Sequence, residues 1–170
     1  KQSRIQDEHE GQVRKRKKPV GSSWRMDETY IKLRGKWVYL YRALDSLGNT
    51  VDFLLREHRD KVAAQAFFRK AFKENCLPEK VVIDKSGSNI AALKDLNDEI
   101  PEGYKIKVLQ VKYLNNIAEQ DHRFIKKRTK PTLGFKNFFS AETTITGIEN
   151  IRIIKKGNII GTNNKISNFE

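Results

Sequence analysis

The chain has 170 residues, enough for one ordinary domain that buries about two-thirds of its unfolded surface. Its 34 Lys and Arg against 21 Asp and Glu give a net charge of +13, which favours a nucleic-acid partner. No apolar run approaches the ~18 residues that span a bilayer and no lipidation motif is present, so we expect no membrane partner. The single cysteine, Cys76, excludes an intramolecular disulfide and argues against a cysteine-based zinc site.

The two ends of the chain differ in composition from the part between them. Residues 1–23 hold seven basic residues, five of them from Arg14 to Lys18, and we interpret them as a basic linker or arm. The basic cluster could lie along a DNA backbone, but a plain linker would have the same composition. Because residues 1–23 are polar and lack an apolar core, we do not expect them to be a signal peptide. Residues 158–170 are expected to form a disordered tail, which leaves 24–157 as the folded domain.

Three strands are predicted at the start of the folded part. The segments 24–35, 37–45 and 50–58 are rich in β-branched and aromatic residues. Turn signals at Gly35-Lys36 and at residues 46–49 separate them at hairpin spacing, which indicates three consecutive antiparallel strands. The aromatic residues expected to pack in the core are Trp24, Trp37, Tyr39 and Tyr41.

Helices and strands alternate after this meander. Asp60 is a suitable N-cap for a helix over 60–75, where apolar residues recur at helical spacing. The remaining predicted elements are a strand at 81–83, a helix at 88–99, a strand at 105–113, a helix from about 115 to 130 and a helix from about 140 to 156. This order predicts an α/β fold of the ribonuclease H-like (retroviral integrase-like) type, a mixed five-stranded sheet flanked by helices.

Three acidic residues could meet at one edge of that sheet. Asp27 lies in the first strand, Asp84 at the carboxyl end of the fourth, and Glu119 in the helix after the fifth. Functional sites gather at the carboxyl ends of parallel strands. Carboxylates suit Mg²⁺ or Mn²⁺, and two such ions can stabilise the attacking and leaving oxygens of an in-line phosphoryl displacement. A lone acid is more often a solvated surface group, and Asp84 before Ser-Gly could also be a turn residue.

Three segments, residues 24–61, 81–89 and 110–149, resemble the DDE transposases of bacterial insertion sequences, in particular the replicative, cointegrate-forming group. The similarity runs from about Trp24 to Gly157. The resemblance implies that Asp27, Asp84 and Glu119 form the metal-binding catalytic triad, and the 34 residues between Asp84 and Glu119 match the separation in retroviral integrases. Asp121 is the rival to Glu119, whereas Glu28 could support the site or stabilise the fold.

Basic residues surround the expected position of Glu119. The candidates for contact with DNA are Arg123, Lys126, Lys127, Lys130 and Lys85. On a helix, Arg123 and Lys126 share the face of Glu119, which favours contact with DNA phosphates. For Lys127 a solvated helix face and a DNA contact are equally supported.

The resemblance also implies the reaction and its partners. It implies metal-dependent cleavage at DNA 3′ ends and strand transfer, with two Mg²⁺ or Mn²⁺ ions as cofactors. The implied partners are element ends, target DNA and further copies of the chain, in the bacterial cytoplasm at the nucleoid. An upstream helix-turn-helix region is implied as well, and residues 1–23 are too short and too polar to form it. The alternative is therefore a truncated, non-catalytic DNA-binding remnant that inhibits the full-length transposase.

Overall fold

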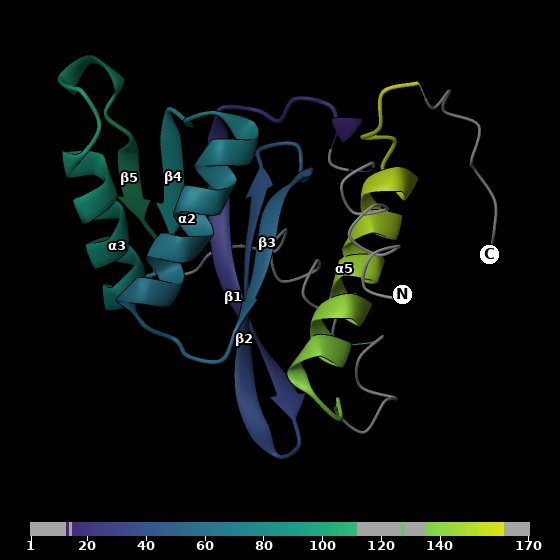
Figure 1. Ribbon diagram of the computed structural model, residues 1–170. Helices are drawn as coiled ribbons and strands as arrows, with labels where there is room; N and C mark the ends of the chain where they lie inside the picture. The colour runs from purple at the N-terminus through teal and green to yellow at the C-terminus, as the bar shows by residue number, and fades with distance from the viewer. Residues whose placement is uncertain (1–12, 14, 112–126, 128–134, 162–170) are drawn as a thin grey trace.

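The computed structural model describes residues 13, 15–111, 127 and 135–161, and it is built on one five-stranded sheet (Figure 1). The strands are β1 (Ser23–Leu33), β2 (Lys36–Asp45), β3 (Thr50–Arg56), β4 (Lys80–Ile83) and β5 (Lys107–Gln110). The helices are α2 (Lys61–Asn75), α3 (Gly87–Asp98) and α5 (Phe138–Lys155), with a 3-10 turn η1 (Glu102–Tyr104). The strand order is β3-β2-β1-β4-β5, with the first three strands antiparallel and β4 and β5 parallel to β1. The predicted α/β class and mixed five-stranded sheet are confirmed.

The β1–β2 hairpin closes one residue earlier than the sequence indicated. Its two turn residues are Arg34 and Gly35, with φ angles of 45° and 81°, and Lys36 already belongs to β2. Positive φ at both central positions is the signature of a type I′ turn, whose twist matches that of the flanking strands. The hairpin therefore extends far past the rest of the sheet, because β3 pairs with β2 only up to Tyr39.

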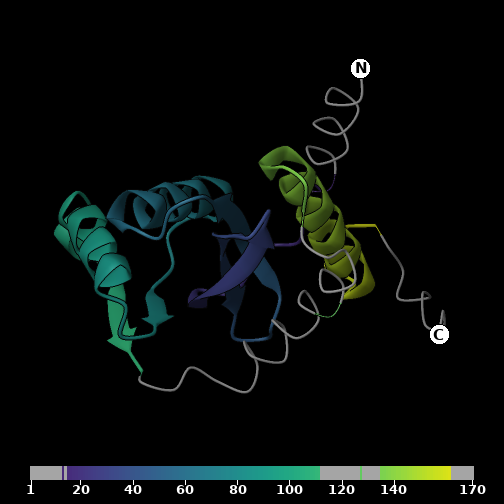
Figure 2. The same cartoon turned by 90° about the horizontal axis from the view of Figure 1, so that it is seen from below.

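The sheet has a hydrophobic core on each face, and Figure 2 shows α5 on the opposite side from α2 and α3. The core under α2 and α3 includes the fully buried Trp24, Met26, Tyr41, Phe67 and Phe68. The core under α5 comprises Ile31, Val38, Leu40, Phe53, Leu55, Phe135, Ala141 and Ile145. The buried apolar residues of β1 follow the period of two, since Trp24 and Met26 belong to the first core and Ile31 to the second.

The predictions for the aromatic residues are partly confirmed. Trp24 and Tyr41 are buried, and Tyr39 is half-buried against the first core. The prediction for Trp37 is wrong, because its side chain is 54% exposed. Trp37 lies at the far end of the hairpin, on the side away from Ile31 and α5, beyond the part of the sheet that α2 and α3 cover.

The helices begin close to where the sequence indicated. Asp60 caps α2 as predicted, since its Oδ1 accepts a hydrogen bond of 2.7 Å from Ala63 N. α5 begins at Phe138 with Asn137 as its N-cap, two residues before the predicted start. β5 is shorter than predicted, and the predicted helix from 115 to 130 lies outside the described residues apart from Lys127. Among the helices described, none is both long and apolar enough to cross a membrane.

Candidate functional site

Two of the three predicted acids, one within β1 and one directly after β4, are related by the register of these adjacent parallel strands. β1 and β4 pair in the register Ser23↔Lys80, Trp24↔Val81 and Arg25↔Val82. The same offset, continued by two residues, aligns Asp27 with Asp84. Neighbouring strands are about 4.8 Å apart, so this continued register places Asp27 beside the C-terminal end of β4, where Asp84 follows the strand.

Local hydrogen bonds orient both carboxylates. Asp27 Oδ1 accepts a hydrogen bond of 2.7 Å from the backbone N–H of Glu28, and Asp84 Oδ1 accepts one of 3.0 Å from Ser86 N. The second bond forms the turn from β4 into α3, so the turn interpretation of Asp84 is correct and is compatible with a site there. The Asp84 side chain remains 40% exposed, which leaves it accessible to a ligand.

Glu28, next to Asp27 in β1, is buried on the face of the sheet that α2 and α3 cover. Its side chain is only 4% exposed, and it forms an ion pair with the Arg59 guanidinium. Asn89 Nδ2, from α3, donates a hydrogen bond of 2.7 Å to Glu28 Oε1. Glu28 is therefore held by two groups from different elements, which gives it a structural and positioning role.

Arg59 connects this buried acid to the candidate site. Its Nη2 lies 4.0 Å from Asp84 Oδ2, while its Nε binds Glu28. Burial lowers the pKa of Arg59, but Glu28, followed by Tyr30 and Asp84, together more than offset this, so the net shift is upward. Arg59 thus carries a fixed positive charge beside Asp84.

An open pocket of about 430 Å³ lies beside Asp84. Its walls are formed by Arg59, Asp84, Lys85, Ser86, Gly87 and Ser88. Lys85 is exposed there, so two cations and two hydroxyl groups face the space next to one carboxylate. This combination suits an anionic ligand that approaches a carboxylate-bound cation.

The donor set of Asp27 and Asp84 fits a hard divalent cation, because Mg²⁺ and Mn²⁺ take carboxylate oxygens. No group of three or more potential metal ligands occurs in the part of the chain that the structure describes. The third predicted ligand, Glu119, and its rival Asp121 lie outside that part. Of the three predicted ligands, the described residues therefore include Asp27 and Asp84.

Some of the predicted DNA-contacting residues lie within the described part of the chain and others lie outside it. Lys85 lines the pocket beside Asp84, and Lys127 is exposed. Arg123, Lys126 and Lys130 lie outside the described residues.

Sequence analysis missed Arg59 and Asn89. Arg59 directly precedes the N-cap of α2, and Asn89 lies in the first turn of α3. The neighbouring sequence does not indicate a role for either residue, because their common partner Glu28 is 31 residues from Arg59 and 61 residues from Asn89. A polar Asn within an otherwise buried helix face is the one signal that could have suggested a buried partner.

Comparison with protein families identifies the segment that carries this site. A family model described as a DDE domain, for transposases of the IS240 type, matches residues 21–158. The chain is 40% identical over 148 residues to two transposases from Staphylococcus aureus, those of insertion sequence-like element IS431mec and of IS257 in transposon Tn4003. These matches cover 85% of the chain and 63% of each relative, so the chain spans less than two-thirds of the relatives' length.

Solved structures with the same fold include two retroviral integrase catalytic core domains. The HTLV-2 domain, in complex with magnesium in its dimeric form, has a TM-score of 0.57 at 14% identity, and the match covers 79% of this chain and 85% of that one. The BIV domain has a TM-score of 0.52 at 13% identity, with 74% and 80% covered. At such low identity these likenesses establish the ribonuclease H-like fold.

Proposed function

The chain belongs to the DDE-domain family of insertion-sequence transposases, and from this premise we propose that it catalyses metal-dependent cleavage at the 3′ ends of a DNA element and transfer of the freed strand into target DNA. The observation that carries the proposal is the parallel register of β1 and β4, which, continued by two residues, places Asp27 within β1 opposite Asp84, the residue that follows β4. Element ends and target DNA are the proposed substrates, so the proposed place of action is the nucleoid, in the bacterial cytoplasm. Because two DNA ends must be joined, we also propose a homo-oligomer as the active form.

Asp27, Asp84 and Glu119 are the proposed ligands of the metal. When bound there, Mg²⁺ or Mn²⁺, expected as two ions, would polarise the phosphoryl group and neutralise charge that develops in the in-line displacement. The backbone N–H groups of Glu28 and Ser86 fix one oxygen each of Asp27 and Asp84, which keeps the two carboxylates oriented before DNA arrives. This preorganisation is the contribution of the backbone within β1 and in the turn after β4.

The cations of the pocket are proposed to orient the DNA. Lys85 and Arg59 would contact phosphates on either side of the reacting one, and such contacts fix the register of the backbone without reading its sequence. Glu28, which accepts a hydrogen bond from Asn89, holds Arg59 in place for this task. Arg123, Lys126, Lys127 and Lys130 are proposed to extend the same basic surface along the DNA.

Strand transfer of a pre-cleaved, labelled DNA end into plasmid, with Mg²⁺ or Mn²⁺, tests the proposal. The chain should join the end, and the Asp84→Asn and Glu119→Gln variants should give only background. The matched control is Asp98→Asn, an exposed acid at the end of α3, which should leave joining unchanged. Joining that persists in Asp84→Asn would overturn the assignment of the site.

The same assay separates the alternative function. If the chain binds DNA but joins no end under any metal condition, and lowers joining by a full-length relative when the two are mixed, then it is a non-catalytic remnant that inhibits transposition. If it joins ends by itself, that alternative is excluded.

A further inference from the structure

The end of the β1–β2 hairpin has one buried and one exposed side. Ile31 and Val38 pack on one side, in the core under α5. Tyr30 and Trp37 stand on the other side and are 45% and 54% exposed. In Figure 1 this end of the hairpin projects well past α2 and α3, so these helices do not extend over it. The exposed side presents two large aromatic side chains to solvent.

The exposed aromatic rings form one cluster with each other. The centroids of Tyr30 and Trp37 are 6.2 Å apart at an interplanar angle of 82°, and those of Tyr30 and Tyr39 are 5.3 Å apart at 65°. Tyr30 is the cross-strand partner of Tyr39, and Trp37 is the partner of Lys32. Edge-to-face contacts of this kind fix the rings, so a ligand that stacks on them loses little side-chain entropy to them.

Cations surround the cluster. Lys32 Nζ lies 5.8 Å from the centre of the Trp37 ring, and Arg59 lies 5.9 Å from that of Tyr30. Three more exposed cations follow in the same part of the sheet: Arg34, Lys36 and Arg56. The nearby acids are the exposed Glu57, the Glu28 carboxylate, which pairs with Arg59, and Asp84, whose Oδ2 lies 4.0 Å from Arg59 Nη2. We call the group Tyr30, Lys32, Trp37 and Arg59 the aromatic–basic platform.

The aromatic–basic platform is continuous with the candidate site. Arg59 Nη1 donates a hydrogen bond of 3.0 Å to Tyr30 Oη, while Nη2 of the same guanidinium lies 4.0 Å from Asp84 Oδ2. A polyanion bound beside Asp84 therefore needs to extend past only one side chain to reach the Tyr30 ring.

We propose that the aromatic–basic platform binds unpaired bases of the DNA next to the reacting phosphate, with bases stacked on Trp37 and Tyr30 and their phosphates neutralised by Lys32 and Arg59. Only unstacked bases can offer their faces to a ring, so the occupant is a single-stranded or frayed segment. The positive charge around the rings favours this occupant over an apolar protein surface. The inference rests on the proposed function in that DNA is the ligand.

Fluorescence anisotropy with three labelled duplexes tests this inference. One duplex carries a short single-stranded overhang, one carries an overhang of equal length made of abasic sites, and one is blunt. The native chain should bind the overhang with bases more tightly than the abasic one. Trp37→Ala should lower the affinity for the overhang with bases by about five-fold or more, since base–aromatic stacking contributes this much. Its affinity for the duplex with the abasic overhang should equal that of the native chain. Trp37→Phe, which keeps a ring, should restore most of the affinity.

Tyr104→Ala is the matched control, because Tyr104 is an aromatic residue that is 73% exposed in η1, outside the aromatic–basic platform. Its affinity for all three duplexes should equal that of the native chain. Quenching of tryptophan emission by the overhang gives a second readout of Trp37, since the other tryptophan, Trp24, is 1% exposed.

Several outcomes would overturn the inference. Equal affinity of the native chain for the two overhangs, or of Trp37→Ala and the native chain for the overhang with bases, would show that no base stacks there. If Trp37→Ala instead lowers the sedimenting mass and leaves DNA binding intact, the surface is an interface between copies of the chain. Each of these results leaves strand transfer by the native chain untouched, whereas failure to bind even blunt DNA would remove the proposed function as well.

Discussion

Two adjacent acids of β1 have opposite surroundings because a strand turns successive side chains to opposite faces. Asp27 lies on the face that the continued register shares with Asp84, whereas the Glu28 side chain is buried between Arg59 and Asn89. Replacing Glu28 with Ala leaves Arg59 with only the more distant Asp84 carboxylate as a partner and removes the acceptor of Asn89 Nδ2. We expect Glu28→Ala to lower the free energy of unfolding by about 2 kcal/mol, a value reduced from the fully buried case because Arg59 is one-third exposed.

Urea unfolding measures this loss, and two variants set its scale. Glu28→Gln keeps an acceptor for Asn89 but not the charge, so it should lose less stability than Glu28→Ala. Glu57→Ala removes an exposed acid nearby and should change the free energy of unfolding by less than about 0.5 kcal/mol. A Glu28→Ala variant as stable as the native chain would mean that the ion pair adds no net stability.

At the scale of elements, a buried polar group joins α5 to the sheet. Arg42 of β2 and Glu149 of α5 are both buried, with 2.9 Å between Nε and Oε1. Thr50 of β3 completes the group, since its hydroxyl accepts a bond from Arg42 Nη2 and donates one to Glu149 Oε2. Burial lowers the pKa of Arg42, and the Glu149 carboxylate partly offsets the shift. Arg152, close by on α5, has its pKa lowered to about 10 by burial and by Arg42.

Removing only Glu149 should lower the free energy of unfolding strongly, whereas removing both Arg42 and Glu149 should lower it much less. We expect Glu149→Leu to lower the free energy of unfolding by about 3–5 kcal/mol, because Arg42 is left as an uncompensated buried charge. The double variant Arg42→Met/Glu149→Leu should recover most of that loss, since it fills the same space with apolar atoms. Thermal and urea unfolding compare the three chains. A double variant no more stable than Glu149→Leu would contradict this account.

What the sequence can predict depends on how far apart along the chain the interacting residues are. The strand meander, the Asp60 cap and the two-residue hairpin depend on neighbouring residues, so their patterns are visible along the chain. The pair Asp27 and Asp84 could be proposed because alternation and strand order define an edge of the sheet. The prediction for Trp37 was wrong because the alternation of side chains along a strand shows which residues face the same side of the sheet. It does not show whether a helix covers that side.

The contacts of Arg59 and Glu149 were not predicted either, because each depends on partners brought together only by the complete fold. Glu28 is 31 residues from Arg59, and the Thr50 hydroxyl is 99 residues from Glu149. No local pattern encodes a separation of this size. Such polar contacts become apparent only when the positions of the elements are known.

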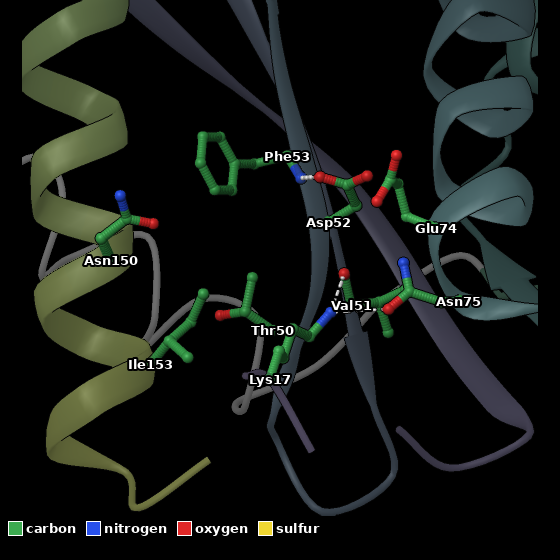
Figure 3. Close-up of a pocket in the computed structure, with 9 residues that line it drawn as sticks. All are labelled: Lys17, Thr50, Val51, Asp52, Phe53, Glu74, Asn75, Asn150 and Ile153. Atoms are coloured by element: carbon green, nitrogen blue, oxygen red, sulfur yellow. Dashed lines mark hydrogen bonds between the residues drawn. The ribbon is translucent and has the colours of Figure 1, made fainter. Parts of the chain in front are cut away.

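At the scale of the whole molecule, the two ends of the described chain are tied together. Lys17 forms an antiparallel bridge with Ile159, flanked by backbone hydrogen bonds from Lys18 N to Asn158 O (2.8 Å) and from Ile160 N to Arg16 O (2.7 Å). The Lys17 ammonium enters a narrow pocket between β3, the end of α2 and α5 (Figure 3). There it donates to Val51 O and, at 2.6 Å, to Asn75 Oδ1.

This arrangement predicts that Lys17 contributes to global stability while its neighbour Lys15 does not. Lys17→Met keeps the length of the side chain but removes both hydrogen bonds, so it should lower the free energy of unfolding by about 1–3 kcal/mol. Lys15 is exposed, and Lys15→Met removes the same charge without these contacts. Urea unfolding of the two variants separates a specific contact from a change in net charge, because the latter affects both equally. Equal stability of the two variants would show that the basic segment only lies against the fold, whereas a loss confined to Lys17→Met would show that it helps hold β3, α2 and α5 together.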